Sequence, residues 1–146
     1  MDYDQLKLEN QLCFPVYAAS RLIIRQYQPY FEQLNITYPQ YLVLMVLWEH
    51  KSLTVNEIAK KLILNTNTIT PLLKRMEKLE LLKRERSTED ERKVLIKLTE
   101  KGLNLREAAA DIPYKLIKSL EKEKISKDHL IYLRDTLNQM ISQFEE

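Results

Sequence analysis

The feature that most constrains this chain is its glycine content, because Gly102 is the only glycine among 146 residues. Phosphate-binding loops of the P-loop and dinucleotide-binding kinds need several glycines, since their backbone turns sharply and approaches the ligand closely. The sequence therefore excludes both. With glycine scarce and Leu, Lys, Glu and Gln abundant, the composition predicts a mainly helical fold. The length fits a single domain with its own core.

Cysteine and histidine are also scarce, which excludes further classes of site. Cys13 is the only cysteine, and His50 and His129 are the only histidines, so the ligands of a structural zinc site are missing. One thiol cannot form an intrachain disulfide, and it fits a reducing cytosol. The chain begins without the basic flank and apolar core of a signal peptide. Its longest apolar run, residues 41–48, is far shorter than the ~20 residues of a membrane span. We expect a cytoplasmic protein without membrane association, metal or cofactor.

Two prolines bear on the first helix. The apolar positions of residues 6–27 keep helical spacing. Pro15 lies inside this stretch and predicts a kink, or a late helix start near Cys13. Pro29 predicts the end of the helix, followed by a short turn or helix over residues 30–34.

Capping residues mark the helices that follow. Thr37 and Gln40 form a capping box ahead of an almost wholly apolar helix, which predicts a central buried element up to about residue 49. Thr54 and Glu57 form a second box, which opens a short helix.

After this short helix the order of elements becomes informative. The polar segment 65–68 precedes another helix with an apolar face, and two short strands are expected on either side of the charged loop 87–92. A helix, a short turn, a second helix and a charged hairpin predict a winged helix-turn-helix. From Thr99 the chain returns to helix, with a break near Pro113 and a last helix over about 126–144.

Cations gather in this middle segment. Residues 54–98 hold eleven Lys or Arg and seven Asp or Glu, a surplus of four, although the whole chain has a net charge of only +2. Hydroxyls and long cations on a helix suit a major groove, and an arginine at a hairpin tip can enter a minor groove. A solvated face would carry the same charges, so it is the order of elements that favours DNA binding. The candidates are Thr68, Thr70, Lys74, Arg75 and Lys78 on the helix, and Lys83, Arg84, Arg86, Arg92 and Lys93 on the hairpin.

Cys13 has two interpretations. Tyr17 lies one helical turn further along the same face, whereas Tyr27 is fourteen residues away, or ~21 Å along a straight helix. A contact of Tyr27 or Tyr38 with the thiol therefore requires a bend or a second subunit. Phenolic hydroxyls can donate hydrogen bonds to a thiolate and so favour a thiol that reacts with peroxide. The simpler interpretation, which spacing alone favours, is a small buried residue beside tyrosines that pack a dimer. With neither histidine nearby, a nucleophilic enzyme is disfavoured.

Five segments resemble a known family: residues 8–14, 35–41, 47–50, 70–77 and 90–92, which read LENQLCF, NITYPQY, LWEH, TPLLKRME and DER. They resemble the MarR family of transcription regulators. More narrowly, they are similar to its one-cysteine, organic-hydroperoxide-sensing OhrR group, to which SarZ and MgrA are related. The resemblance extends from about residue 6 to residue 102.

The resemblance implies a single MarR-type domain over residues 1–146. Residues 1–36 and 100–146 would form a helical dimerisation region, and residues 37–99 a winged helix-turn-helix that binds a pseudo-palindromic operator in double-stranded DNA. The implied function is that of a repressor acting as a homodimer.

The resemblance also implies a role for the thiol. In this family two tyrosines of the partner subunit hold the cysteine, and by motif these residues are Cys13, Tyr27 and Tyr38, with Tyr17 nearby. Organic hydroperoxide would oxidise Cys13 to a sulfenic acid, which a low-molecular-weight thiol caps as a mixed disulfide or further oxidant overoxidises. The altered dimer would then release its DNA.

For DNA binding, the family pattern implies that Asp90 orients Arg92 toward the minor groove. The full expected set is Thr66, Asn67, Thr68, Thr70, Lys74, Arg75, Arg86, Asp90 and Arg92. The chain departs from the family at residues 64–68, which read LNTNT where LDSGT is usual, although Asn67 can still adopt a left-handed conformation. It departs again at Pro15, beside the thiol.

Two other functions remain open at this stage. One is a MarR-type regulator released by a small phenolic ligand, with Cys13 incidental, for which a Cys13→Ser variant would keep its response. The other is a helical protein-interaction module that does not bind DNA. An enzyme is the least favoured class, since consumption of hydroperoxide by one thiol should be stoichiometric.

Overall fold

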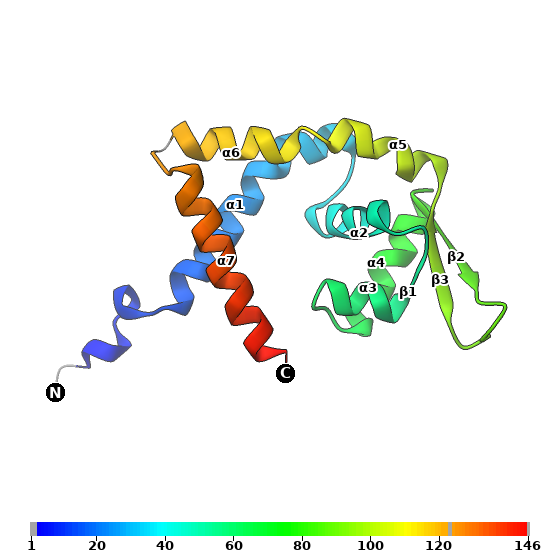
Figure 1. Cartoon of the computed structure of the whole chain (residues 1–146), viewed down its shortest axis with the longest axis horizontal. Coiled ribbons are helices and arrows are strands. Elements are labelled where there is room, and N and C mark those ends of the chain that lie inside the picture. The colour runs from blue at the N-terminus through cyan, green and yellow to red at the C-terminus, as the bar shows by residue number, and fades with distance from the viewer. Residues whose placement is uncertain (1–2, 123, 146) are drawn as a thin grey trace. The chain divides into compact units, whose positions relative to one another are not determined.

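The computed structural model describes residues 3–122 and 124–145, and helices make up most of it (Figure 1). Contacts divide the chain into two compact units, one ending at Ala110 and one beginning at Asp111. The first unit begins with two short 3₁₀ helices, η1 (Asp4–Leu6) and η2 (Leu8–Asn10). Its α-helices are α1 (Cys13–Leu34), α2 (Tyr38–Glu49), α3 (Val55–Lys61), α4 (Thr66–Lys78) and α5 (Glu100–Ala109). Its strands are β1 (Leu53–Thr54), β2 (Leu82–Arg86) and β3 (Val94–Leu98). The second contains α6 (Ile112–Lys122) and α7 (Lys127–Phe144).

Both capping boxes form where the sequence predicts them. The Thr37 hydroxyl accepts from the Gln40 backbone N–H at 3.4 Å, and the Gln40 side chain accepts from the Thr37 N–H at 2.9 Å. Glu57 and Thr54 make the same exchange at 2.7 and 3.2 Å. These bonds satisfy backbone donors that a helix start leaves unpaired, so they fix the first residues of α2 and α3.

The first helix begins where expected but ends later. It starts at Cys13, which places Pro15 in the first turn, where a missing N–H costs little. The prediction that Pro29 ends this helix is wrong, because α1 continues through Pro29 to Leu34. Phe31, one turn's length beyond Tyr27, is buried against the aromatic side chains of α2. This packing offsets the hydrogen bond that proline removes.

The turn of the helix-turn-helix differs from the prediction as well. Asn67 lies inside α4, and Ile63 is the residue with a left-handed backbone, at φ 55°. The N–H of Leu64 reaches the Ala59 carbonyl at 2.9 Å, and the N–H of Ile63 reaches the Lys60 carbonyl at 3.2 Å. These two bonds form a Schellman motif at the end of α3, in which glycine is the usual left-handed residue. A β-branched side chain is strained there.

We therefore expect Ile63→Gly to stabilise the protein, by up to about 1 kcal/mol in the free energy of unfolding. Glycine removes the left-handed strain, and its own entropic cost offsets part of the gain. Ile63 is also largely exposed, so little packing is lost. Urea unfolding measures the difference, and Ile63→Val, which keeps the β-branch, serves as the control. A glycine variant no more stable than wild type would contradict the expectation.

The wing is a three-stranded antiparallel sheet of order β1-β3-β2. The hairpin predicted from the sequence is β2 and β3, whose ladder runs from the pair Leu82–Leu98 to the pair Arg86–Val94. The third strand, β1, has only two residues, and Leu53 pairs with Ile96. Two residues are too few for an alternating pattern to reveal, so the sequence did not predict β1.

The core of the first unit lies between α2, α3, α4 and the sheet, which group together in Figure 1. The fully buried side chains come from all of them: Val43, Leu44, Ile58, Ile69, Leu73, Met76, Leu82 and Ile96. Helix α2 is thus the buried central element that its apolar sequence predicts. Among the described residues, no helix is both long and apolar enough to cross a membrane.

Candidate nucleic-acid interface and thiol site

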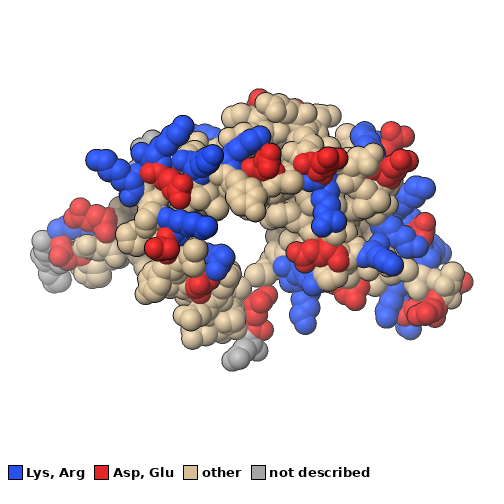
Figure 2. Space-filling model, turned by 45° about the horizontal axis from the view of Figure 1, so that its top comes forward, with Lys and Arg blue, Asp and Glu red and all other residues tan. Residues whose placement is uncertain are grey.

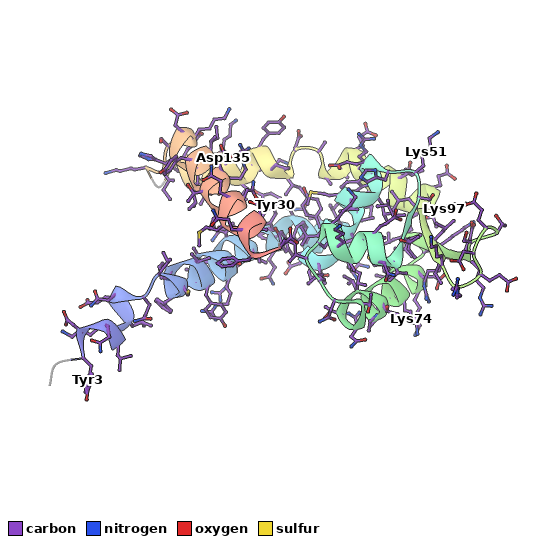
Figure 3. All side chains as sticks on the ribbon, turned by 60° about the horizontal axis from the view of Figure 1, so that its bottom comes forward. Tyr3, Tyr30, Lys51, Lys74, Lys97 and Asp135 are labelled. Atoms are coloured by element: carbon purple, nitrogen blue, oxygen red, sulfur yellow. The ribbon has the colours of Figure 1, made fainter. Side chains whose placement is uncertain are left out.

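The face of α4 that does not pack on the core carries the predicted DNA-binding residues. Ile69, Leu72, Leu73 and Met76 are buried. This leaves Thr66, Asn67, Thr68, Lys74 and Arg75 exposed and Thr70 half-buried. Lys74 projects outward from the helix (Figure 3).

The start of α4 is held by Asn65. Its side-chain oxygen accepts the Thr68 N–H at 2.9 Å and the Thr68 hydroxyl at 3.1 Å. Asparagine here satisfies a free backbone donor of the first turn, as the aspartate usual at this position would. The first-turn side chains Thr66 and Asn67 remain exposed.

The tip of the wing is ordered by short-range hydrogen bonds. Asp90 Oδ1 accepts from the backbone N–H and the Nε of Arg92, at 3.1 and 3.3 Å. The buried Ser87 hydroxyl accepts from the N–H groups of Glu89 and Asp90, at 3.2 and 3.4 Å. The Arg92 side chain is 92% exposed, so Asp90 orients a cation that is otherwise free to reach a ligand. Insertion of Arg92 into a minor groove of DNA stays a prediction.

A groove of about 550 Å³ lies between the first turns of α3 and α4 and the wing. Thr66 and Thr70 line it from the helix, and Arg84, Arg92 and Lys93 line it from the wing. Figure 2 shows lysine and arginine side chains gathered, with acidic ones among them, over the end of the molecule that carries the sheet. The local surplus of cations expected from the sequence is therefore present at the surface.

The thiol lies far from two of its predicted partners within one chain. Cys13 is exposed at the start of α1, and Tyr17 follows one turn later, with the Arg21 guanidinium 4.6 Å from its ring centre. Because α1 is one continuous helix from Cys13 to Leu34, Tyr27 lies ~21 Å away along its axis. A bend therefore cannot bring them together within one chain. The exposure of Cys13 also argues against a cysteine buried in the fold.

The two predicted tyrosines lie next to each other. The ring centres of Tyr27 and Tyr38 are 5.3 Å apart. Phe31 stacks on Tyr27 at 5.2 Å and 8°, and Tyr41 lies within 6.2 to 6.4 Å of both phenols. Phe31 and Tyr41 were not predicted as members of this cluster, although their helical spacing from Tyr27 and Tyr38 was a usable signal.

Burial changes the acid–base behaviour of this cluster. It raises the pKa of Tyr27 to about 12, with smaller contributions from Tyr38 and Tyr41. Burial also raises the pKa of Tyr38 and of Tyr41. A phenol is protonated at neutral pH even at its ordinary pKa of about 10, and burial holds these phenols further in that state, so they can act as hydrogen-bond donors.

No group of three or more His, Cys, Asp or Glu side chains within residues 3–122 and 124–145 is arranged to hold a metal ion.

A helix-turn-helix whose second helix exposes hydroxyls and cations, followed by a basic wing, defines a winged-helix DNA-binding regulator. The family profile described as transcriptional regulator SarA/Rot matches residues 25–109. The chain belongs to this family of MarR-like transcriptional regulators. The family resemblance noted from the sequence is thereby confirmed.

Two curated relatives match nearly the whole chain. The organic hydroperoxide resistance transcriptional regulator of Bacillus subtilis (strain 168) is 52% identical over 141 residues, which cover 94% of this chain and 96% of the relative. The HTH-type transcriptional regulator MgrA of Staphylococcus aureus is 40% identical over 144 residues, which cover 98% and 96%.

A third relative, AbfR, has been solved on DNA. In its reduced form it is 38% identical, with a TM-score of 0.78 and full coverage of both chains. In its overoxidised form, also bound to DNA, the identity is 39%, the TM-score 0.76 and the coverage 99% of each chain. The mainly helical winged-helix fold is thus shared with DNA-bound regulators.

Proposed function

We propose that this regulator is a homodimeric repressor that senses organic hydroperoxide through Cys13 and then releases its DNA. One observation carries the proposal. An exposed thiol stands at the start of α1, and the phenol of Tyr27 lies ~21 Å along the same helix, next to the phenol of Tyr38 at the start of α2. These are two halves of one thiol site, and only a second copy of the chain can bring them together. The 52% identity to a hydroperoxide resistance regulator supports the same assignment.

Exposed apolar side chains support the homodimer. They occur on the first half of α1 and along α7: Phe14, Val16, Tyr17, Leu22, Ile131, Leu133 and Ile141. Surfaces of this kind usually mark an interface. In a two-fold dimer each copy would supply Cys13 to one site and Tyr27 with Tyr38 to the other, so two equivalent sites would form.

The proposed chemistry needs only the thiol, the hydroperoxide and a small thiol. The Cys13 thiolate attacks the terminal oxygen of ROOH, the O–O bond breaks, and a sulfenic acid forms while RO⁻ takes up a proton and leaves as ROH. A low-molecular-weight thiol then attacks the sulfenic sulfur, and water leaves as the mixed disulfide forms. Hydrogen bonds from Tyr27 and Tyr38 hold the starting thiolate. Each Cys13 consumes one hydroperoxide until a reductant restores it.

We assign DNA release to the mixed disulfide. The cap adds bulk at the phenols and removes their hydrogen bonds, which changes how the dimer places its two DNA-binding regions. The relative AbfR, solved on DNA in an overoxidised form, supports this choice over release by overoxidation. On the DNA side, Thr66, Asn67, Thr68, Thr70, Lys74 and Arg75 would contact the major groove, and Arg86 and Arg92, with Asp90 as orienting group, the minor groove.

The test is fluorescence anisotropy on labelled DNA from the protein's own promoter region, with cumene hydroperoxide and a small thiol added. Wild type should bind and then dissociate, whereas Cys13→Ser should bind equally well and stay bound. Peroxide without the thiol separates the effect of the cap from that of overoxidation. Release of both proteins, or of neither, would show that Cys13 is not the switch.

A second candidate function is release by a small phenolic acid. A pocket of about 460 Å³ beside the phenols is lined by Arg21, Arg25, Phe31 and Tyr38, among others, and arginines next to an aromatic wall suit such an anion. In the same assay, salicylate should release Cys13→Ser as well as wild type if this function holds.

A further inference from the structure

We infer that Arg84 binds a backbone phosphate of the DNA strand that passes between α4 and the wing. The inference rests on the proposed placement of α4 in the major groove and of the wing in the neighbouring minor groove. In the sequence Arg84 is one of several hairpin cations, whereas the structure gives it a distinct position.

The register of the wing directs Arg84 toward the helix-turn-helix. On β2 the alternate residues Leu82 and Arg84 share a face, and Arg84 pairs with the buried Ile96 of β3. Side chains alternate between the two faces of a strand. Lys83 therefore points to the opposite face, where it pairs with Lys97. Arg84 is only 23% exposed and lines the groove that faces Thr66 and Thr70, whereas Lys83 is exposed.

Within the described part of the chain, the hydrogen bonding of Arg84 is incomplete. One oxygen of Glu77 accepts the Arg84 backbone N–H at 3.1 Å. The other lies 3.9 Å from Nη1, at the limit of an ion pair. Nε is buried and has no hydrogen-bond partner among the described residues. A guanidinium has five donors, and a covered donor without an acceptor destabilises a protein. A small rotation of the side chain into the groove would offer these donors to an acceptor from outside.

The acceptor that fits this place is a phosphate. One sugar-phosphate strand separates a major groove from the adjacent minor groove, so a protein with a helix in one and a wing in the other must straddle that strand. The groove lies at this point, with threonine hydroxyls on one wall and Arg92 and Lys93 on the other. Arginine donates to phosphate through two parallel N–H groups.

One acidic side chain also lines the groove and could oppose a phosphate. It is Glu57, whose carboxylate accepts from the N–H and the hydroxyl of Thr54 at 2.7 and 2.9 Å. These bonds hold it in the cap of α3, and they partly offset its charge. Glu77 does not line the groove, and its hydrogen bond goes to the Arg84 backbone N–H and not to the guanidinium.

The test compares Arg84→Gln with Lys83→Gln by anisotropy over a range of salt concentrations. The two variants lose the same charge at neighbouring positions of one strand, so long-range electrostatics are matched. Arg84→Gln should weaken binding about tenfold or more and reduce the slope of log affinity against log salt by about one, equally on promoter and unrelated duplexes. Lys83→Gln should stay within about twofold of wild type in affinity, because Lys83 points to the opposite face of the strand, away from the groove.

Equal effects of the two variants would overturn the inference. Circular dichroism checks that both fold. If Arg84→Gln does not, Arg84→Lys replaces it, and loss of the two-pronged contact should weaken binding several-fold. Wild-type affinity in that variant would also overturn the inference. Arg92→Ala separates this failure from that of the proposed function: if it too leaves affinity unchanged, the DNA-binding face itself is wrongly assigned.

Discussion

Replacing Gly102 with alanine should lower the free energy of unfolding by about 2–4 kcal/mol. A Cβ atom at this position would lie 2.1 Å from the Leu81 carbonyl oxygen and 3.1 Å from a methyl carbon of Leu98. The first contact is with backbone, which cannot rotate aside as a side chain can. Helix α5 would therefore have to move away from the base of the wing.

Such a movement would disturb a junction between three elements. The Gly102 carbonyl accepts the Trp48 indole N–H of α2 at 2.9 Å, and its N–H reaches the Thr99 hydroxyl at 3.1 Å. Just before β2, the Glu80 carbonyl accepts the Thr99 hydroxyl at 2.5 Å, and the Leu81 carbonyl accepts the Thr99 backbone N–H at 3.2 Å. The same glycine thus joins the central helix, the wing and α5.

Urea unfolding checks this prediction, whose sign is opposite to the one expected for glycine-to-alanine replacement in an ordinary helix. In an ordinary helix interior, alanine stabilises relative to glycine by up to about 1 kcal/mol. Asn104→Ala, at an exposed position of the same helix, is the matched control and should change stability by no more than about 0.5 kcal/mol. A Gly102→Ala protein as stable as wild type would show that the close approach is not tight in solution.

The role of Gly102 also shows where inference from the sequence stops. The scarcity of glycine predicts helix, but the requirement for glycine at position 102 comes from Leu81, which lies 21 positions away along the chain. Signals confined to a few residues predicted correctly: both capping boxes, the start of α1 and the β2–β3 hairpin. Pro29 misled because Phe31 packs on α2, a contact that no local pattern contains. The polar residues 65–68 indicated the turn too late in the chain, because Ile63 is the left-handed residue and Asn65 already caps α4.

Part of the candidate site could likewise be predicted from the sequence, and part could not. Hydroxyls and cations on α4 could be predicted, since helical periodicity fixes the face opposite a buried stripe. Arg84 could not be separated from Lys83 until the strand register placed the two on opposite faces, nor from Arg86 until the lining of the groove was known. The separation of Cys13 from Tyr27 followed from helix geometry, but only the continuity of α1 excluded a bend.

Phe31→Ala should produce the other large effect, a loss of about 3–5 kcal/mol in the free energy of unfolding. Phe31 is buried, and its ring centre lies 5.2 Å from that of Tyr27, 6.1 Å from that of Tyr38 and 5.0 Å from that of Tyr41. Alanine would leave a cavity among three phenols, which are polar enough at their hydroxyls to admit water. Phe31→Leu keeps most of the volume and should lose less.

The same substitution should change how the tyrosines titrate. In wild type the fold raises the pKa of Tyr27 to about 12 from 10, so the folded state binds this proton more tightly than the unfolded state. Its contribution to stability is therefore present below pH 10 and is lost as the pH rises from 10 through 12. In Phe31→Ala, water reaching the phenols should bring the pKa of Tyr27 back toward 10. Ultraviolet absorbance of tyrosinate during an alkaline titration measures this, provided that folding is monitored alongside.

The stability and the tyrosine titration of the Phe31 variants also bear on the proposed sensor. Phe31 contacts both Tyr27 and Tyr38 but would not contact the Cys13 thiol. If the phenols must be held in place to hold the Cys13 thiolate, folded Phe31→Ala and Phe31→Leu should react more slowly with hydroperoxide than wild type. Their affinity for DNA in the reduced state should fall much less, since α4 and the wing are unchanged. Wild-type reaction rates in variants whose tyrosine titration has shifted would mean that the phenols do not govern the thiol, and would favour the pocket beside them as the site of the signal.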